Sequence, residues 1–487
     1  MSKFPLRFLL TLELLGLAAC TTGPTKPSAA IPPAAPAARL FPITEHGAVG
    51  DGATIATKAI QGAIDACAAA GGGTVVVPSG VFLSGALYFK PGVSLEVKQG
   101  GVLKSTNAMA DFPPLYTSWE GVERYWTSAF LNFVGIDGVQ VTGEGTIDGS
   151  GLGWGSARRP GGSGAGRPRP PAAVPTAPAP PLPQVAEVYR SPLPTTAAVA
   201  FAPDPAHLPP INAAGVPLPG GGGRVSPPRA VVFQNCTNVR LAGLHLVNPG
   251  RWGFVFIYCE HVVAENLTVR TESYIPSSDG IDVCSTRDVR ITGCDIACND
   301  DNISIKSGKD ADGMRVNRPS ENITISDCTF GTGGGVAMGS EITGSIRHVL
   351  VERCTFTGSG TAARIKSQPS RGGVVEDIVF RDIQLKNVSR AFDFDLEWRM
   401  VPPLAPRAKV LSAIRDVRLI DYRGTAQSGG VIRGYPESPI ERLAFVRCQV
   451  TAQRGLVLAN ARDPDLSGLQ LTVAEGEAIS RPPAAKE

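Results

Sequence analysis

The sequence predicts an all-β protein built as a parallel β-solenoid, with one short helix near its start. A unit of alternating apolar and polar residues recurs through the second half of the chain, and each copy ends in a turn. The copies are spaced by about the length of one solenoid coil. A short strand cannot bury its apolar face alone, so successive copies are expected to stack.

The first residues resemble an export signal. Lys3 and Arg7 precede a short apolar run that ends in small residues at Cys20, and this run is too short for a permanent membrane span. The letters "LAAC" resemble the bacterial lipoprotein signal, in which the cysteine is lipidated; an ordinary cleaved signal is the alternative. We expect a signal peptide at 1–19, lipidation at Cys20, a flexible tether at 20–40, and an outer-membrane lipoprotein or periplasmic protein.

The folded part, expected over residues 41–487, opens with a helix that caps the solenoid. Its apolar residues recur at helical spacing, and glycines at 71–73 end it; they are Ala59, Ile60, Ala63, Ile64 and Cys67. Short strands separated by turn glycines follow it, as in "TVVVP", "GVFLSG", "SLEVK" and "VQVTGEGTIDG". The first half therefore predicts a capping helix followed by strands.

A segment rich in proline and glycine interrupts the strands at about 154–228. Proline lacks a backbone donor and glycine is conformationally free, so this composition favours neither helix nor strand. Strand patterns of one kind occur on both sides of it. An insertion into one catalytic domain is therefore the preferred interpretation, and a linker between two domains is the alternative.

The repeat that follows has an apolar anchor in each copy. Val262 follows Val239 by 23 residues, and Val349 follows Ile323 by 26. The full set of anchors is Val239, Val262, Val289, Ile323, Val349, Ile378, Val417, Leu443 and Leu469. Cysteines keep fixed distances from these anchors, so they are expected to stack inside the solenoid as small hydrophobes, with a disulfide between stacked neighbours as the alternative. They are Cys236, Cys259, Cys294, Cys328, Cys354 and Cys448.

Composition excludes some functions. The formal net charge is +3, which is too small to indicate a nucleic-acid partner. The chain has 10 cysteines, but no CxxC pair or His/Cys cluster that predicts a metal site. We therefore expect neither a metal nor a cofactor.

Four successive strands align to define one outward face of the solenoid. "DGIDVCS", "DNISIKS", "GGVAMGS" and "TAARIKS" share apolar residues at their third and fifth positions, which are expected to face the core. Strand side chains alternate, so the intervening positions face outward. They are Asp282, Ser304, Lys306, Ala337, Gly339, Arg364 and Lys366.

Three carboxylates stand at the entrances of these strands. Asp279 and Asp301 are 22 residues apart and should lie on neighbouring coils, with Asp300 beside them. Carboxylates this close repel, so at least one should hold its proton near neutral pH, which gives the acid and the base that glycosidic hydrolysis requires. A pair roughly 6.5–9.5 Å apart would leave room for water and invert the anomer. Simple turn residues and a calcium site are the alternatives.

Arg364 and Lys366 are two residues apart on one strand and face the same way. Arginine offers a two-pronged donor and lysine a point charge. The pair is suited to the carboxylate of an acidic sugar, with Asp282 and Lys306 as further substrate contacts.

These residues resemble glycoside hydrolase family 28, the pectin-degrading polygalacturonases and rhamnogalacturonan hydrolases. The resemblance covers nearly all of the chain outside the signal and the insertion, through "HGAVGDG", "GGGTVVVPSG", "GTIDGSG", "SDGIDV", "NDDNISIKSG", "GVAMGSE", "RIKS" and "YPESPIE". It implies a right-handed parallel β-helix that hydrolyses pectic polysaccharide with inversion and without a cofactor. Asp300 is then the general acid, Asp279 and Asp301 activate water, and Arg364 and Lys366 bind the sugar carboxylate.

The chain departs from the family pattern in three places. The family's Asn-Thr-Asp is Ser277-Ser278-Asp279, its Gly-Asp-Asp is 299–301 with Asn299, and its Gly-His-Gly is 333–335, so that Gly334 replaces a histidine. "GGGVAMGSE" resembles the rhamnogalacturonan-cleaving branch.

We therefore expect a secreted, monomeric hydrolase that cleaves α-linked galacturonate bonds in polygalacturonan or rhamnogalacturonan of the plant cell wall. It would contact a membrane only through its lipid anchor. A β-helix polysaccharide lyase and a non-catalytic pectin-binding solenoid are the alternatives.

Overall fold

The computed structural model describes residues 39–154, 226–272, 274–398 and 405–482. The expected signal peptide, Cys20, the tether up to residue 38 and residues 155–225 of the insertion lie outside the described residues. The predictions made for them therefore stay predictions.

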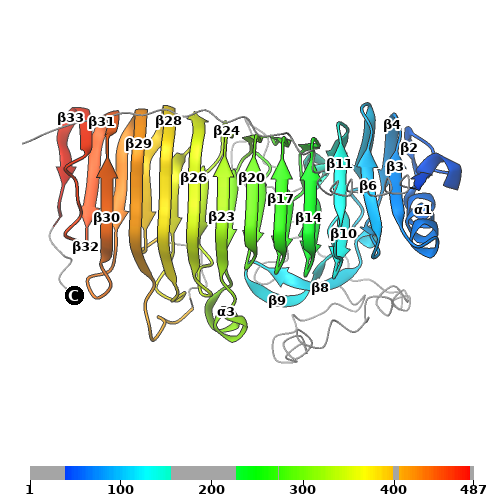
Figure 1. Cartoon of the computed structure of the whole chain (residues 1–487), viewed down its shortest axis with the longest axis horizontal. Coiled ribbons are helices and arrows are strands. Elements are labelled where there is room, and N and C mark those ends of the chain that lie inside the picture. Colours follow the sequence, from blue (N-terminus) through cyan, green and yellow to red (C-terminus); the bar gives the residue numbers. More distant parts are fainter. Residues whose placement is uncertain (1–38, 155–225, 273, 399–404, 483–487) are drawn as a thin grey trace, which may run out of the picture. The chain divides into compact units, whose positions relative to one another are not determined.

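The repeated unit is a coil of three short strands joined by tight turns. The strands of neighbouring coils pair in parallel, as in Val231↔Phe254 and Val239↔Val262. The front strands of Figure 1 consequently stand side by side in one row. The predicted parallel β-solenoid is confirmed, with strands in three such rows.

The site row carries the site described below. It consists of β5 (Leu87–Tyr88), β10 (Leu131–Val134), β13 (Val231–Gln234), β16 (Phe254–Ile257), β19 (Ile281–Cys284), β22 (Ile303–Lys306), β25 (Val336–Gly339) and β27 (Thr361–Lys366). The row continues into the ends of longer strands that turn from one row into the next.

The anchor row carries the apolar anchors. It consists of β1 (Leu40–Pro42), β3 (Gly73–Val77), β6 (Val93–Val97), β11 (Gln140–Gly143), β14 (Thr237–Ala242), β17 (Glu260–Glu265), β20 (Arg287–Thr292), β23 (Ser320–Ser326), β26 (Ile346–Thr357), β28 (Val374–Asp395), β29 (Ala413–Arg433), β30 (Ile440–Val446) and β32 (Ala461–Arg462).

The closing row completes each coil. It consists of β2 (Asp51–Ile55), β4 (Gly80–Ser84), β7 (Gly101–Ser105), β12 (Thr146–Asp148), β15 (His245–Val247), β18 (Thr268–Arg270), β21 (Asp295–Ala297), β24 (Thr329–Phe330), parts of β26, β28 and β29, β31 (Cys448–Ala459) and β33 (Leu469–Ser480). The coils before and after the insertion are direct neighbours, because β10 pairs with β13 and β11 with β14.

The predicted register is confirmed for the anchors from Val239 to Leu443, which pair in succession along the anchor row. The last anchor is wrong, because Leu469 pairs with Cys448 in the closing row. In the final coil the chain passes the anchor row in the two-residue strand β32, so spacing from earlier copies no longer predicts the register.

Bends in the coils are placed by residues that tolerate a left-handed backbone. The residue just before several anchors has a positive φ, as at Asn238 (52°), His261 (56°) and Asp288 (57°). Short polar side chains such as Asn and Asp adopt this conformation at low cost. The strand bends there, and the anchor turns into the core.

The interior of the solenoid consists of stacked like residues. Phe133 lies between Phe89 and Phe233, with ring centroids at 4.2 and 4.7 Å. The cysteines at 236, 259, 294, 328, 354 and 448 are buried and free. Their predicted role as small hydrophobes is confirmed, since stacked strands place equivalent side chains about 4.8 Å apart.

The predicted helix is α1 (Thr57–Ala69), which buries Ile60, Ala63, Ile64 and Cys67. It lies against the first strands of the anchor row, at the end of the row coloured blue in Figure 1. One-turn helices occur at η1 (Ile43–His46), η2 (Met109–Asp111) and η3 (Gly151–Gly153).

The sequence analysis did not predict a hairpin beside the solenoid or a second helix. β8 (Pro114–Trp119) and β9 (Val122–Thr127) form an antiparallel hairpin, and α3 (Asp310–Val316) is a short helix after β22. Figure 1 shows the hairpin and α3 along one edge of the row, and the backbone N–H of Lys309 donates to Gly121 O at 3.1 Å. Within the described part of the chain, no helix has the length and apolar character needed to cross a bilayer.

Candidate active site

Neighbouring strands of the site row bring the predicted residues together. Ile281, Ile303, Val336 and Ala363 pair in succession through β19, β22, β25 and β27, as the internal alignment predicts. All four are buried in the core. The alternate residues therefore point away from it, on adjacent coils.

The three predicted carboxylates meet at the entrances of β19 and β22. One carboxylate oxygen from each of Asp279, Asp300 and Asp301 lies within 4.8 Å of the others. The backbone joins the two coils here, because the N–H of Gly280 donates to Asp301 O at 3.0 Å. The cluster that the sequence predicts is confirmed.

The nearest oxygens of the cluster lie within 4.8 Å of one another. The expected separation of roughly 6.5–9.5 Å refers to whole carboxyl groups, so it stays a prediction. Positive charge favours the close approach, because Lys306 contacts Asp279, and Lys366 contacts Asp301, at 3.3 and 2.7 Å. These ammonium groups reduce the repulsion that would otherwise splay the carboxylates apart.

The three carboxylates differ in exposure. Asp279 and Asp301 are buried, whereas Asp300 is partly exposed. The backbone N–H of Asp301 donates to Asp300 Oδ1 at 3.0 Å, which orients the more exposed carboxyl. Asp300 is therefore the member of the cluster that an outside molecule reaches most directly.

Arg364 and Lys366 converge on Asp301. Lys366 Nζ donates to Asp301 Oδ2 at 2.7 Å, and Arg364 Nη1 lies 3.4 Å from Oδ1. Arg364 Nε also lies 3.0 Å from Asp393 Oδ2, and Arg390 Nη1 lies 2.7 Å from Asp393 Oδ1. The sequence analysis missed Asp393, whose position opposite Arg364 follows only from the pairing of β27 with β28.

Lys306 is buried under the site. Its Nζ donates to Asp282 Oδ1 at 2.6 Å and to Asp279 Oδ2 at 3.3 Å, and it also donates to the hydroxyl of Ser304. The ammonium lies 4.4 Å from the ring centroid of Trp252. Trp252 stacks on Trp119 of the hairpin with ring centroids at 5.0 Å.

The outward direction predicted for Asp282 and Lys306 is confirmed, but their expected exposure is wrong. Asp282 is completely buried and Lys306 is 5 % exposed. Trp252 lies over Lys306, and the hairpin lies over Trp252, so the outward side of these strands is covered. Substrate contacts by Asp282 and Lys306, like those by Arg364 and Lys366, stay predictions.

The carboxylates of the cluster differ in proton affinity. Burial raises the pKa of Asp300, and the charge of Asp301 raises it further. Burial also raises the pKa of Asp301, but the charges of Lys366 and Arg364 outweigh burial and hold it below its usual value. The geometry thus places a carboxyl with a raised pKa beside a carboxyl with a lowered pKa, which is the direction that the sequence predicts.

Burial is also the largest influence on the pKa values of Asp279 and Asp282. It raises the pKa of Asp279 well above its usual value, with the charge of Asp282 adding to the rise, and raises that of Asp282 to about 6. Burial lowers the pKa of Lys306, but the charges of Asp282 and Asp279 outweigh it and the pKa is raised. Lys306 is therefore a permanent cation.

Gly334 faces the same cluster. A Cβ atom there would lie 2.4 Å from Asp301 Oδ1 and 3.2 Å from Arg364 Nη1. The site can therefore accommodate Asp301 in its present position only because residue 334 has no side chain.

The arrangement is suited to acid–base chemistry on an anionic substrate and not to calcium. Three oxygens close together are a common start of a metal site. Here, however, Lys306, Lys366 and Arg364 already contact Asp279 and Asp301. A divalent cation would have to displace these positive charges.

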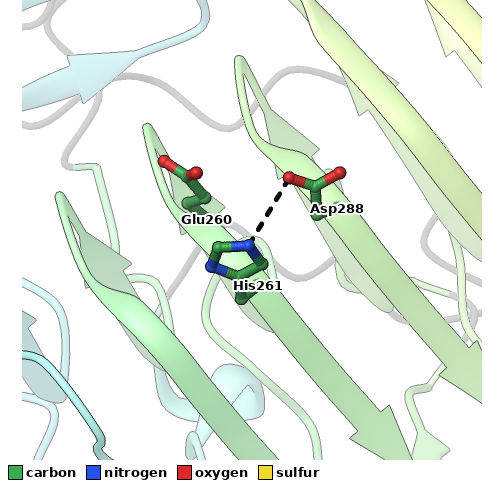
Figure 2. Close-up of side chains that lie close together, drawn as sticks. All are labelled: Glu260, His261 and Asp288. Carbon is green, nitrogen blue, oxygen red and sulfur yellow. Dashed lines mark ion pairs between the residues drawn. The ribbon is translucent and has the colours of Figure 1, made fainter.

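A second cluster with metal-ligand chemistry lies on the outer side of the anchor row, at Glu260, His261 and Asp288 (Figure 2). His261 is exposed, and its Nε2 is 3.8 Å from Asp288 Oδ2. Glu260 already forms an ion pair with Arg287 at 2.5 Å. Exposed groups of this kind are common, and we assign no site to them.

Comparisons with known proteins find a family model and several polygalacturonases that are similar to this chain. The model of a family described as glycosyl hydrolases family 28 matches residues 222–438. The chain is 28 % identical over 366 residues to an exo-poly-α-D-galacturonosidase from Dickeya chrysanthemi, which covers 72 % of this chain. It is 26 % identical to an endo-polygalacturonase from Pectobacterium parmentieri, over 70 % of this chain and 71 % of the relative.

Among solved structures, an exopolygalacturonase from Thermotoga maritima superimposes with a TM-score of 0.68 at 26 % identity, covering 87 % of each chain. The chain spans 56 % of the length of the Dickeya protein and 60 % of that of a probable polygalacturonase from Arabidopsis thaliana.

Proposed function

We propose that the chain, whose residues 222–438 match the model of glycosyl hydrolases family 28, is a glycoside hydrolase that cleaves α-linked galacturonate bonds in pectic polysaccharide. The observation that carries the proposal is the cluster of Asp279, Asp300 and Asp301, with Lys366 bound to Asp301 at 2.7 Å. It places a carboxyl with a raised pKa beside one with a lowered pKa, which is what glycosidic hydrolysis needs.

In this proposal Asp300 is the general acid. Its proton passes to the glycosidic oxygen as the bond from that oxygen to the anomeric carbon breaks. A water molecule adds to the anomeric carbon and gives its proton to Asp279 or Asp301, so that the anomer inverts in one displacement. NMR of the first product tests this step, because inversion of an α-linkage releases the β-anomer and retention releases the α-anomer.

The substrate is proposed from the charge of the site. Arg364 and Lys366 face the cluster from β27, and the Arg364 side chain is 17 % exposed. A guanidinium next to a lysine is suited to a sugar carboxylate. Polygalacturonan is the preferred substrate, as the names of the relatives support, and rhamnogalacturonan is the second candidate because Gly334 replaces the family histidine.

Cleavage from a chain end is the preferred mode. The hairpin residues Trp119 and Trp126 form one buried cluster with Val232 and Val255, the outward residues of β13 and β16. This cluster covers the site row on the N-terminal side of Asp279. This cluster would block a polysaccharide chain that extends past the site on that side. The end of a chain could bind next to the cluster.

The deciding experiment is incubation with polygalacturonan, rhamnogalacturonan and defined oligosaccharides of both, followed by product sizing. Accumulation of mono- or digalacturonate from the start supports end cleavage, and a broad range of sizes contradicts it. An unsaturated product that absorbs ultraviolet light and disappears with chelator would indicate the lyase. Binding with no product would indicate the non-catalytic solenoid.

Localisation, lipidation and domain organisation remain proposals from the sequence. We propose a lipoprotein anchored at Cys20, with one catalytic domain over 41–487 that acts as a monomer. Fractionation with labelled fatty acid tests the anchor, since Cys20→Ser should lose both the label and the membrane association. Light scattering of the chain without its first 20 residues tests the monomer.

A further inference from the structure

The ammonium group of Lys306 contacts two buried carboxylates, those of Asp279 and Asp282. Its Nζ is 2.6 Å from Asp282 Oδ1 and 3.3 Å from Asp279 Oδ2, and all three residues are at most 5 % exposed. Asp282 does not belong to the cluster of three carboxylates. Its charge raises the pKa of Asp279 directly, and it also acts on Asp279 through the shared lysine.

The two bases of the site are therefore neutralised differently. Asp301 has Lys366 at 2.7 Å and Arg364 at 3.4 Å. Asp279 shares the one ammonium of Lys306 with Asp282, which is the nearer partner. Sharing leaves Asp279 more basic than Asp301, because a carboxylate with its own close cation holds a proton less tightly.

Asp279 also has an oxygen available for chemistry. Among the described residues, its Oδ1 atom has no hydrogen-bond partner although it is buried, while Oδ2 contacts Lys306. Lys306 thus holds one oxygen of Asp279 and leaves the other without a hydrogen bond. An oxygen in this state is suited to accept a proton from water.

We propose that Lys306 and Asp282 are positioning residues, which hold Asp279 in place and set its charge so that it acts as the base that activates water. The inference rests on the proposed function. Lys306 opposes the rise in the pKa of Asp279 that burial causes. Asp282 is the lysine's nearer partner, and so it leaves Asp279 more basic than Asp301.

Other titratable and charged groups surround this unit and stay unchanged in the variants below. Those that act on Asp279 and Lys306 from the neighbouring elements are Asp300, Asp301, Cys298, Cys284, Glu341 and Glu120. Burial raises the pKa of both thiols, so they remain neutral.

The test is the pH dependence of kcat/KM on trigalacturonate for three variants. Lys306→Met leaves Asp279 without its cation, which raises the pKa of Asp279. The acidic limb of the pH profile of kcat/KM should therefore move to higher pH by about one unit or more. Asp282→Asn gives Asp279 the whole lysine, so the same limb should move to lower pH. The double variant removes one charge of each sign and should lie between the two.

Opposite shifts of the acidic limb in Lys306→Met and Asp282→Asn support the inference. A purely structural role would move the acidic limb of both variants in the same direction, or would lower kcat without moving it in either variant. Lys309→Met is the matched control: Lys309 lies three residues further along, 3.8 Å from Glu120, and should leave the limb in place. The inference is overturned if both variants fold and their acidic limbs move in the same direction or do not move. Asp282→Asn alone decides it if Lys306→Met does not fold.

A second readout separates this inference from the proposed function. The protein is labelled with carboxyl-¹³C aspartate, and the NMR signal that disappears in Asp279→Asn is assigned to Asp279. The pH dependence of that signal reports the titration of Asp279 in the absence of substrate. Opposite displacements of its midpoint in the two single variants support the inference, and unchanged midpoints overturn it. Failure of the wild type to hydrolyse any pectic oligosaccharide overturns the proposed function, and the NMR titration then decides the electrostatic relationship by itself.

Discussion

The ammonium of Lys366 lies 2.7 Å from a carboxylate oxygen of Asp301, although the two residues are 65 positions apart in the chain. β22 and β27 flank β25 in the site row, and this spacing lets a side chain of one coil reach a turn two coils away. The lysine expected to bind substrate therefore also stabilises a carboxylate of the proposed catalytic cluster.

Lys366→Met should lower both activity and stability. Asp301 has a lowered pKa in the folded protein, so its ionised form stabilises the fold above the ordinary value of 3.8, and this contribution is lost as pH falls through the lower folded pKa. Removing one partner of a buried ion pair costs about 3–5 kcal/mol. The difference in unfolding free energy from the wild type should be large at neutral pH and shrink in acid; an equal difference at every pH would contradict it.

Asp300→Asn should abolish hydrolysis without loss of stability. A general acid contributes about 10²–10⁴-fold to the rate, and asparagine keeps the shape but has no proton to give. Reducing-end release from oligogalacturonides measures the loss, and thermal unfolding checks the fold. Asp295→Asn is the control, since Asp295 is a partly exposed residue on β21 that forms an ion pair with Arg270. Rates like the wild type in Asp300→Asn would remove it as the acid.

Arg364→Met should weaken binding of acidic oligosaccharides far more than neutral ones. The Arg364 side chain is 17 % exposed, against 10 % for Lys366, so it is the more accessible cation. Calorimetry with trigalacturonate and with its methyl ester, on an inactive Asp300→Asn background, compares the two ligands. Equal losses for both would reject a contact with the sugar carboxylate.

Gly334→Ala should reduce activity, because its Cβ would lie 2.4 Å from Asp301 Oδ1 and 3.2 Å from the Asp301 Cα. Lys366 holds that carboxylate, so it cannot move away freely. Crowding of this kind costs about 1–3 kcal/mol of stability. Gly62→Ala is the control: it lies in α1 with nothing within 4 Å of the added atom, so it should raise the unfolding temperature slightly and leave kcat unchanged. Full activity in Gly334→Ala would show that Asp301 has another place to lie.

Trp119→Ala should broaden the range of products from polygalacturonan. It removes the ring that stacks on Trp126 and Trp252, at 5.2 and 5.0 Å, and so loosens the hairpin from the site row. Tyr125→Ala on the same hairpin is the control, because Tyr125 is 39 % exposed and outside that cluster. An unchanged product range in a folded Trp119→Ala variant would separate the hairpin from the mode of cleavage.

Much of the fold could be predicted because one local rule repeats. Val239 and Val262 occupy equivalent coils, and a strand's alternation is visible in a few letters of sequence. The same rule predicted that Asp279 and Asp301 meet, since it fixes which residues stand side by side. It failed at Leu469, where the final coil is shortened.

The remaining features depend on contacts that the repeat does not encode. The hairpin at 114–127 leaves the coil and returns over it, so nothing in its own pattern indicates that it covers Trp252. The burial of Lys306 follows from that cover, and so do the raised pKa values beneath it. Asp393 was missed because a single aspartate in a long strand gives no signal until its partner strand is known.

The stacking of equivalent strands determines where the chain can tolerate the insertion of a whole coil. One whole winding added between β28 and β29 would lengthen the protein and leave every charged group of the site beside its present neighbour. The same addition between β19 and β22 would draw Asp279 away from Asp301 by about 4.8 Å. Duplications are therefore expected to survive selection towards the C-terminus and to inactivate the protein when they fall between those two strands.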